Sequence, residues 1–151
     1  MNPFSLAQVF FIWIVGFGLL SYFLKEKIAG IFLMSRLPRI INYFIILTPL
    51  VLVEEFLTCD IRPYLSRVKI TLPAFYLLFI VLYFVQRFAK TNYRTTSIIF
   101  GCIGWFTEFV VNGLMYILPI PTTVLFSVLV VLIYAVLALM PTYYLEKTLP
   151  H

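Results

Sequence analysis

Five long apolar stretches, separated by short polar linkers, are the feature that most limits what this chain can fold into. They cover residues 4–24, 40–58, 70–88, 97–118 and 122–145. Each approaches the roughly 20 apolar residues that an α-helix needs to cross a bilayer. Only 11% of all residues are charged, against roughly 25% in a soluble domain. The sequence therefore predicts an all-α, polytopic membrane protein with five transmembrane helices in one bundle.

The linkers are too short to fold into an extramembrane domain, so residues 1–151 are expected to form a single membrane domain. The first stretch is interpreted as a retained helix, since no Lys or Arg precedes it and its apolar run is too long for a signal peptide. Residues 28–39 are apolar but too short to cross, which favours a short interfacial segment after the first helix. The alternative is that the first helix continues past Lys25 and bends.

The formal charge of +5 comes from basic residues that lie between the apolar stretches. Eight of the eleven follow the first, third and fifth stretches, and three lie in the second linker. Because cytoplasmic loops carry an excess of Lys and Arg, this bias predicts an N-terminus outside and a C-terminus in the cytoplasm. The lipid bilayer is the expected partner, and no nucleic-acid partner is assigned. The eight are Lys25, Lys27, Arg36, Arg39, Arg87, Lys90, Arg94 and Lys147, and the three are Arg62, Arg67 and Lys69.

Three of the six acidic residues, Glu54, Glu55 and Glu108, lie within the apolar stretches, with no Lys or Arg close by in the same stretch. A carboxyl group at hydrocarbon depth costs several kcal/mol unless it is protonated or paired. Such residues are rare in transmembrane segments and usually face the interior of the bundle. These three are therefore the candidates for a catalytic role, for binding a proton or a cation, or for a polar contact between helices.

The fourth stretch places polar and small residues along one helical face. Gly101, Gly104, Glu108, Asn112 and Met115 follow one another at spacings of three or four residues. Glycines in a membrane helix allow a neighbouring helix to approach closely, and polar side chains can then form hydrogen bonds across the contact. The pattern predicts an inward-facing stripe, with Gly101 and Gly104 for packing and Glu108 and Asn112 for polar contacts.

In the second stretch, Glu54 and Glu55 point about 100° apart and must have different neighbours. Glu55 shares its face with Arg62 if the helix continues that far, and an Asp60–Arg62 or Glu55–Arg62 pair is expected at the outer rim. If the second and fourth stretches pack together, at least two carboxyl groups would share a poorly hydrated space. Such a group would hold a proton or a cation.

Some kinds of site are excluded by missing residues. The only histidine is the terminal His151, so no histidine base or ligand set can operate inside the membrane. Cys59 and Cys102 are expected at opposite sides of the membrane, too far apart for a disulfide. No metal site or cofactor is predicted.

Residues 53–59, Val-Glu-Glu-Phe-Leu-Thr-Cys, resemble the first motif of the CAAX-processing and bacteriocin-immunity type of intramembrane protease. That motif expects an Arg where Cys59 stands, and the second motif expects a His where Gly104 stands. No later His exists in the membrane stretches. The resemblance therefore implies no proteolytic site.

Three hypotheses on function remain open. The first is a non-catalytic subunit or accessory protein that binds another membrane protein or forms a homo-oligomer. The second is an intramembrane enzyme that uses Glu54, Glu55 or Glu108 as acid and base on a lipid or isoprenoid substrate. The third is a proton- or cation-coupled transporter, which with so few helices would require a homodimer.

Overall fold

The computed structural model describes residues 9–58, 64–117 and 119–149, and every regular element in this part of the chain is a helix. The all-α prediction is therefore confirmed for these residues. Two elements, η1 and η2, are π-helical. In chain order the elements are η1 (Val9–Phe17), α2 (Gly18–Leu33), α3 (Arg39–Thr58), α4 (Tyr64–Ala89), α5 (Tyr93–Phe106), η2 (Thr107–Val111), α6 (Leu114–Ile117) and α7 (Ile120–Thr148).

Three helices among the described residues are long and apolar enough to cross a membrane. They lie at Arg39–Leu57 in α3, Val68–Ala89 in α4 and Ile120–Thr148 in α7. The first and fourth apolar stretches are divided between two or more elements, so neither forms a single α-helix of spanning length. The structure thus supports a helical protein with three candidate spans and does not establish the five that were predicted.

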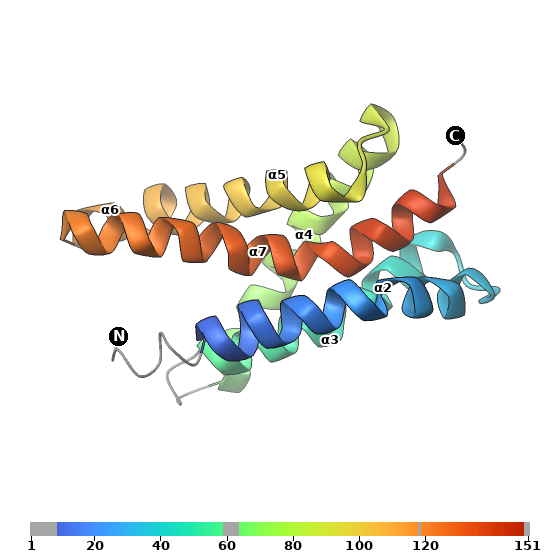
Figure 1. Ribbon diagram of the computed structural model, residues 1–151, viewed down its shortest axis with the longest axis horizontal. Coiled ribbons are helices and arrows are strands. Elements are labelled where there is room, and N and C mark those ends of the chain that lie inside the picture. The colour runs from blue at the N-terminus through green and yellow to red at the C-terminus, as the bar shows by residue number, and fades with distance from the viewer. Residues whose placement is uncertain (1–8, 59–63, 118, 150–151) are drawn as a thin grey trace.

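Helix α7 is the central element of the fold. It packs along α5 and also contacts α2, α3 and α4. Figure 1 shows α2, α3, α5 and α7 extending along the long axis, while α4 crosses behind them at a steep angle. Because α7 touches all four longer helices, its side chains can join groups from distant parts of the sequence.

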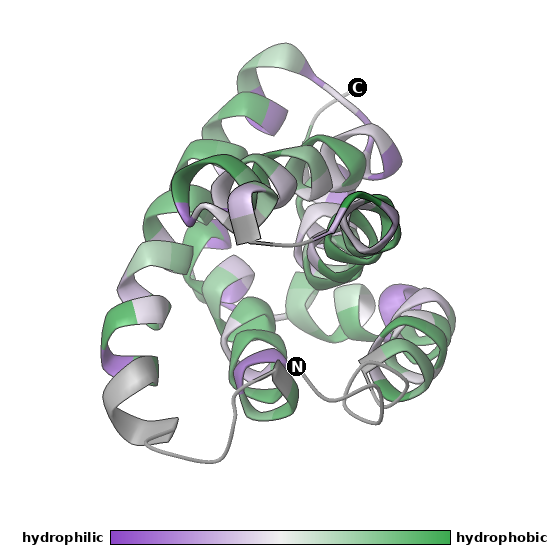
Figure 2. Ribbon diagram, turned by 90° about the vertical axis from the view of Figure 1, so that its left-hand side faces the viewer, coloured by the Kyte–Doolittle hydropathy of each residue, from purple (hydrophilic) through white to green (hydrophobic). Residues whose placement is uncertain are grey.

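The outer surface of this bundle is apolar. Large hydrophobic side chains such as Phe23, Phe88 and Ile120 are 73%, 78% and 82% exposed. Figure 2 looks at the molecule from one end and shows hydrophobic residues on the outward sides of the helices as well as between them. Water would make such a surface unstable, whereas lipid chains are a suitable solvent for it.

Residues 28–39 do not form a separate helix, as the prediction of a short interfacial segment required. Helix α2 continues to Leu33, and after a short turn α3 begins at Arg39. The first helix therefore continues past Lys25, as the alternative interpretation stated, while the bend that it also included stays a prediction. The physical reason is that Lys25 is buried, with its ammonium donating to the Tyr22 carbonyl at 3.1 Å and lying 3.4 Å from the centre of the Tyr22 ring. The charge is accommodated within the helix and does not end it.

The helix predicted over residues 97–118 also differs from the structure. Helix α5 begins earlier, at Tyr93, because the Asn92 side chain accepts a hydrogen bond from the Thr95 N–H at 2.9 Å and caps it. The α-helix ends at Phe106 and continues as the π-helical turn η2. Gly113, with φ of +75°, then breaks the chain direction before α6. Met115 therefore lies beyond the break and is exposed, outside the predicted stripe.

Candidate functional site

Gly101 and Gly104 lie where α5 meets α7. A Cβ atom on Gly101 would stand 2.5 Å from the Val131 carbonyl oxygen, and one on Gly104 would overlap the Tyr134 ring. Any larger residue at either position would push the two helices apart. The absence of a side chain at Gly104 is what allows the Tyr134 ring to lie directly against the backbone of α5, and Gly101 makes the same room for the backbone of Val131.

Glu108, in η2, is half-buried and uses both of its carboxyl oxygens within the protein. Its Oε1 accepts a hydrogen bond from the Tyr134 hydroxyl at 2.8 Å, and its Oε2 accepts one from the Asn112 amide at 3.0 Å. Asn112 itself is exposed. The hydrogen bond with Tyr134 connects η2 to α7. Glu108 therefore holds the end of the fourth apolar stretch against the central helix.

Glu54 and Glu55, near the end of α3, are both buried, at 6% exposure each. Both interact electrostatically with the Tyr134 phenol, as Glu108 does. The aromatic ring of Tyr134 lies near Phe75 and Phe100, with ring centres 5.8 and 5.7 Å away. One tyrosine thus lies within electrostatic reach of Glu54, Glu55 and Glu108. We call Glu54, Glu55, Glu108, Asn112 and Tyr134 the Tyr134 cluster.

The cluster forms differently from the predicted arrangement, in which carboxyl groups meet if the second and fourth stretches pack on each other. In the structure the main contacts of α3 and α5 include α7, which packs against both. Tyr134 on α7 therefore bonds to Glu108 of η2 and lies within electrostatic reach of Glu54 and Glu55 of α3.

Tyr134 is the residue that sequence reasoning missed. The available signal was its position: it stands in the middle of the last apolar stretch, far from either interface. A phenol at that depth needs a hydrogen-bond partner, and a carboxyl group is a suitable acceptor.

The outer-rim pairs predicted from sequence cannot be placed. Asp60 and Arg62, together with Cys59, lie outside the described residues, so neither the Glu55–Arg62 nor the Asp60–Arg62 pair is described. Within the described ranges, no group of three or more His, Cys, Asp or Glu residues is arranged to hold a metal ion.

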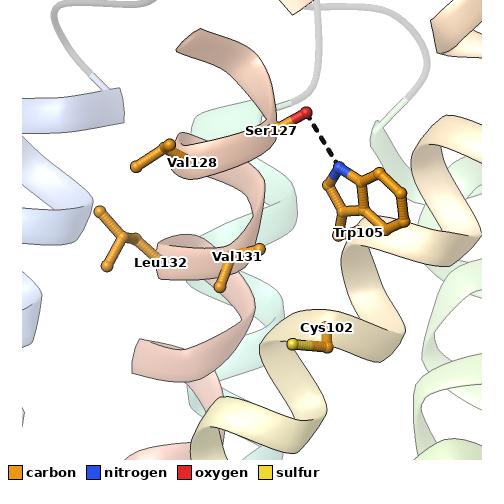
Figure 3. Close-up of a pocket in the computed structure, with 6 residues that line it drawn as sticks. All are labelled: Cys102, Trp105, Ser127, Val128, Val131 and Leu132. Atoms are coloured by element: carbon orange, nitrogen blue, oxygen red, sulfur yellow. Dashed lines mark hydrogen bonds between the residues drawn. The ribbon is translucent and has the colours of Figure 1, made fainter. Parts of the chain in front are cut away.

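An apolar groove lies between α5 and α7, on a different part of their surface. Its volume is about 320 Å³, and nearly all of its surface is apolar. Figure 3 shows Trp105 on α5 donating its indole N–H to the Ser127 hydroxyl on α7, at 2.9 Å, across one side of the groove. Cys102 lies below this bond and is an exposed free thiol. The groove is lined by Cys102, Trp105, Ser127, Val128, Val131 and Leu132, none of which belongs to the Tyr134 cluster.

Comparison of the chain with protein-family models, with curated proteins and with solved structures found no match. No family match therefore accompanies the resemblance of residues 53–59 to an intramembrane protease. Function has to be inferred from the geometry of the cluster and the groove.

Proposed function

We propose that this protein is a non-catalytic subunit or accessory protein of a membrane assembly. The observation that supports it best is that both oxygens of Glu108 accept hydrogen bonds from the protein's own side chains. Hydrogen-bonded polar side chains are a known means of holding membrane helices together. In this proposal the Tyr134 cluster stabilises the bundle, and the outer surface of the bundle binds another helix.

The groove between α5 and α7 is the contact surface of this proposal. In a bilayer, helices associate through close van der Waals packing, and small residues at the contact favour it. Cys102 and Ser127 are small and lie in an apolar groove, which suits a transmembrane helix of a partner or of a second copy. Large outward side chains beside the groove, such as Val128 at 55% exposure, would be covered by that helix.

The proposal includes an orientation, with the N-terminus outside and the C-terminus in the cytoplasm. Its support is the excess of basic residues in the linkers that follow the first and third stretches and in the C-terminal tail. Reporter fusions to the C-terminus, of one enzyme active only in the cytoplasm and one active only outside, test it. If only the external reporter is active, the C-terminus lies outside, and the proposed orientation is wrong.

Cross-linking at Cys102 tests the contact surface. Because the chain has two cysteines, Cys59→Ser leaves Cys102 as its single thiol. Oxidation of membranes holding this variant is expected to produce a disulfide-linked species, either a dimer or an adduct with a partner that mass spectrometry identifies. The control carries Cys59→Ser, Cys102→Ser and Leu77→Cys, which moves the thiol to an outward position on α4 that is 67% exposed.

Cross-linking through Cys102 but not through the cysteine at position 77 supports the groove as an interface. Equal cross-linking at both positions would indicate random collision in the membrane. If light scattering in mild detergent shows a monomer and no cross-link forms, the subunit proposal is wrong.

The position of Tyr134, bonded to Glu108 and within electrostatic reach of Glu54 and Glu55, favours a second candidate, in which the cluster handles protons. It would act as the acid–base centre of an enzyme with a lipophilic substrate, or as the coupling site of a proton- or cation-coupled transporter in a homodimer. Glu54, Glu55 and Glu108 do not line the apolar groove, where such a substrate would enter. Proton flux in liposomes that survives Glu54→Gln, Glu55→Gln and Glu108→Gln together would eliminate the transport form.

A further inference from the structure

A polar pocket lies where α2 ends, α3 begins and α7 ends. Figure 1 shows these three helix ends at the same end of the molecule. The volume of the pocket is about 280 Å³, and its surface is mainly polar, in contrast to the apolar groove. The described residues that line it include two cationic side chains and no carboxylate. Its polar lining consists of Ser35, Arg39, Asn42, Tyr144, Lys147 and Thr148.

The positive charge of this pocket has two sources. Arg39 and Lys147 are both exposed and approach it from different helices. Arg39 is also the first residue of α3, a helix of 20 residues. The first N–H groups of a helix have no acceptor within the helix, and its dipole places partial positive charge there. The pocket therefore attracts an anion.

Asn42 supplies an independent indication of a ligand. It is 1% exposed, and its amide nitrogen donates to the Phe32 carbonyl at 3.0 Å and to the Tyr144 hydroxyl at 3.1 Å. Its Oδ1 is buried and has no hydrogen-bond partner among the described atoms. Buried polar atoms are almost always paired, because leaving one unpaired costs free energy. A donor on a ligand in this pocket would satisfy Oδ1.

The Tyr144 hydroxyl, which is hydrogen-bonded to Asn42, is also a donor available to a ligand. Since its oxygen accepts from Asn42, the phenol keeps its own proton for another acceptor. The Ser35 hydroxyl likewise accepts from the Leu37 N–H at 3.1 Å and keeps its proton. The pocket thus offers two cations and two hydroxyl donors to an anion, together with one buried acceptor.

We propose that this pocket binds a phosphate-bearing group that also carries a hydroxyl or ammonium donor. The phosphate lies between Arg39 and Lys147, and the donor reaches Asn42 Oδ1. The pocket volume is slightly below the range of about 300–1,000 Å³ that is usual for small-molecule sites, which suits a compact headgroup. Basic pockets between transmembrane helices bind the phosphate groups of lipids. The same chemistry is found in a lipid headgroup and in a soluble phosphate ester.

The test compares two double variants with equal loss of charge. Arg39→Gln with Lys147→Gln removes both cations of the pocket. Lys27→Gln with Arg36→Gln removes two exposed cations that do not line it. Native mass spectrometry in detergent measures binding of phosphatidylglycerol, with soluble glycerol phosphate as competitor. Thermal unfolding shows that both double variants are folded.

We expect the pocket variant to bind phosphatidylglycerol at least tenfold more weakly than the wild type, because charge-assisted hydrogen bonds are lost. The control variant should bind within twofold of the wild type. Displacement of the lipid by glycerol phosphate would identify a soluble ligand, and failure of displacement would identify the lipid; either result supports the phosphate site.

Two results would overturn the proposal: an equal loss of binding in both double variants, or no saturable binding of either probe to the wild type. The role of Asn42 has its own measurement. Phosphatidylethanolamine and phosphatidylglycerol carry headgroup donors and should bind more tightly than phosphatidylcholine, which carries the phosphate without such a donor. Equal affinity for all three would show that Asn42 Oδ1 does not recognise the headgroup.

Discussion

The Tyr134 hydroxyl on α7 donates a 2.8 Å hydrogen bond to Glu108, which lies 26 residues earlier in the π-helical turn η2. This bond is possible because Gly104 leaves the space that the Tyr134 ring occupies. The glycine on α5 thus allows the hydrogen bond between α7 and η2 to form.

Tyr134→Phe is expected to destabilise the protein by about 1 kcal/mol, since hydrogen bonds between membrane helices contribute roughly 0.6 to 2 kcal/mol. Reversible unfolding in mixed detergent micelles measures this. The matched control is Tyr116→Phe, because Tyr116 is 81% exposed and should be neutral. In a double-mutant cycle with Glu108→Gln, strictly additive effects would mean that the two side chains are not energetically coupled.

Gly104→Ala is expected to cost about 1–3 kcal/mol, because its methyl group would overlap the Tyr134 ring and separate α5 from α7. Gly30→Ala is the control: a Cβ atom at Gly30, inside α2, meets nothing within 4 Å. There, the better helix propensity of alanine should stabilise by roughly 0.5–1 kcal/mol. Thermal unfolding of both variants measures the difference, and a neutral Gly104→Ala would show that the close helix contact is not required.

Glu108→Gln is expected to leave both the fold and any oligomer intact. Its amide oxygen can still accept from the Tyr134 hydroxyl, and the Asn112 amide can turn so that its oxygen faces the new NH₂ group. Glu108→Leu removes both acceptors and should destabilise more. Light scattering in mild detergent measures assembly. Loss of assembly after Glu108→Gln, with the monomer still folded, would argue against a purely structural role for Glu108.

Lys25→Gln is expected to lower stability, because the ammonium lies 3.4 Å from the centre of the Tyr22 ring and 5.5 Å from that of Tyr143. Cation–π contacts contribute about 0.5–2 kcal/mol, with larger values where water is excluded. Lys27→Gln, two residues further on and exposed, should have no effect. If both variants unfold at the same temperature, the aromatic surroundings of Lys25 do not stabilise the helix.

The candidate site could be predicted in part. Glu54, Glu55 and Glu108 stand out from sequence because each is a carboxyl group in an apolar stretch, and the glycine spacing of Gly101 and Gly104 indicates a close helix contact. The partner helix could not be read in the same way, since periodicity shows which residues share a face but not what that face meets.

The helical class and the presence of helices apolar enough to cross a membrane followed from the sequence alone, because long hydrophobic runs with few charges are typical of helices that lie in lipid. The tertiary structure decided which groups meet. Tyr134 bonds to Glu108 of η2 within electrostatic reach of Glu54 and Glu55, and Lys25 lies among tyrosines from α2, α5 and α7. Both arrangements arise because α7 packs against helices that are distant in the chain. Contacts between residues so far apart in the chain depend on how the helices pack, and a local sequence pattern does not determine that packing.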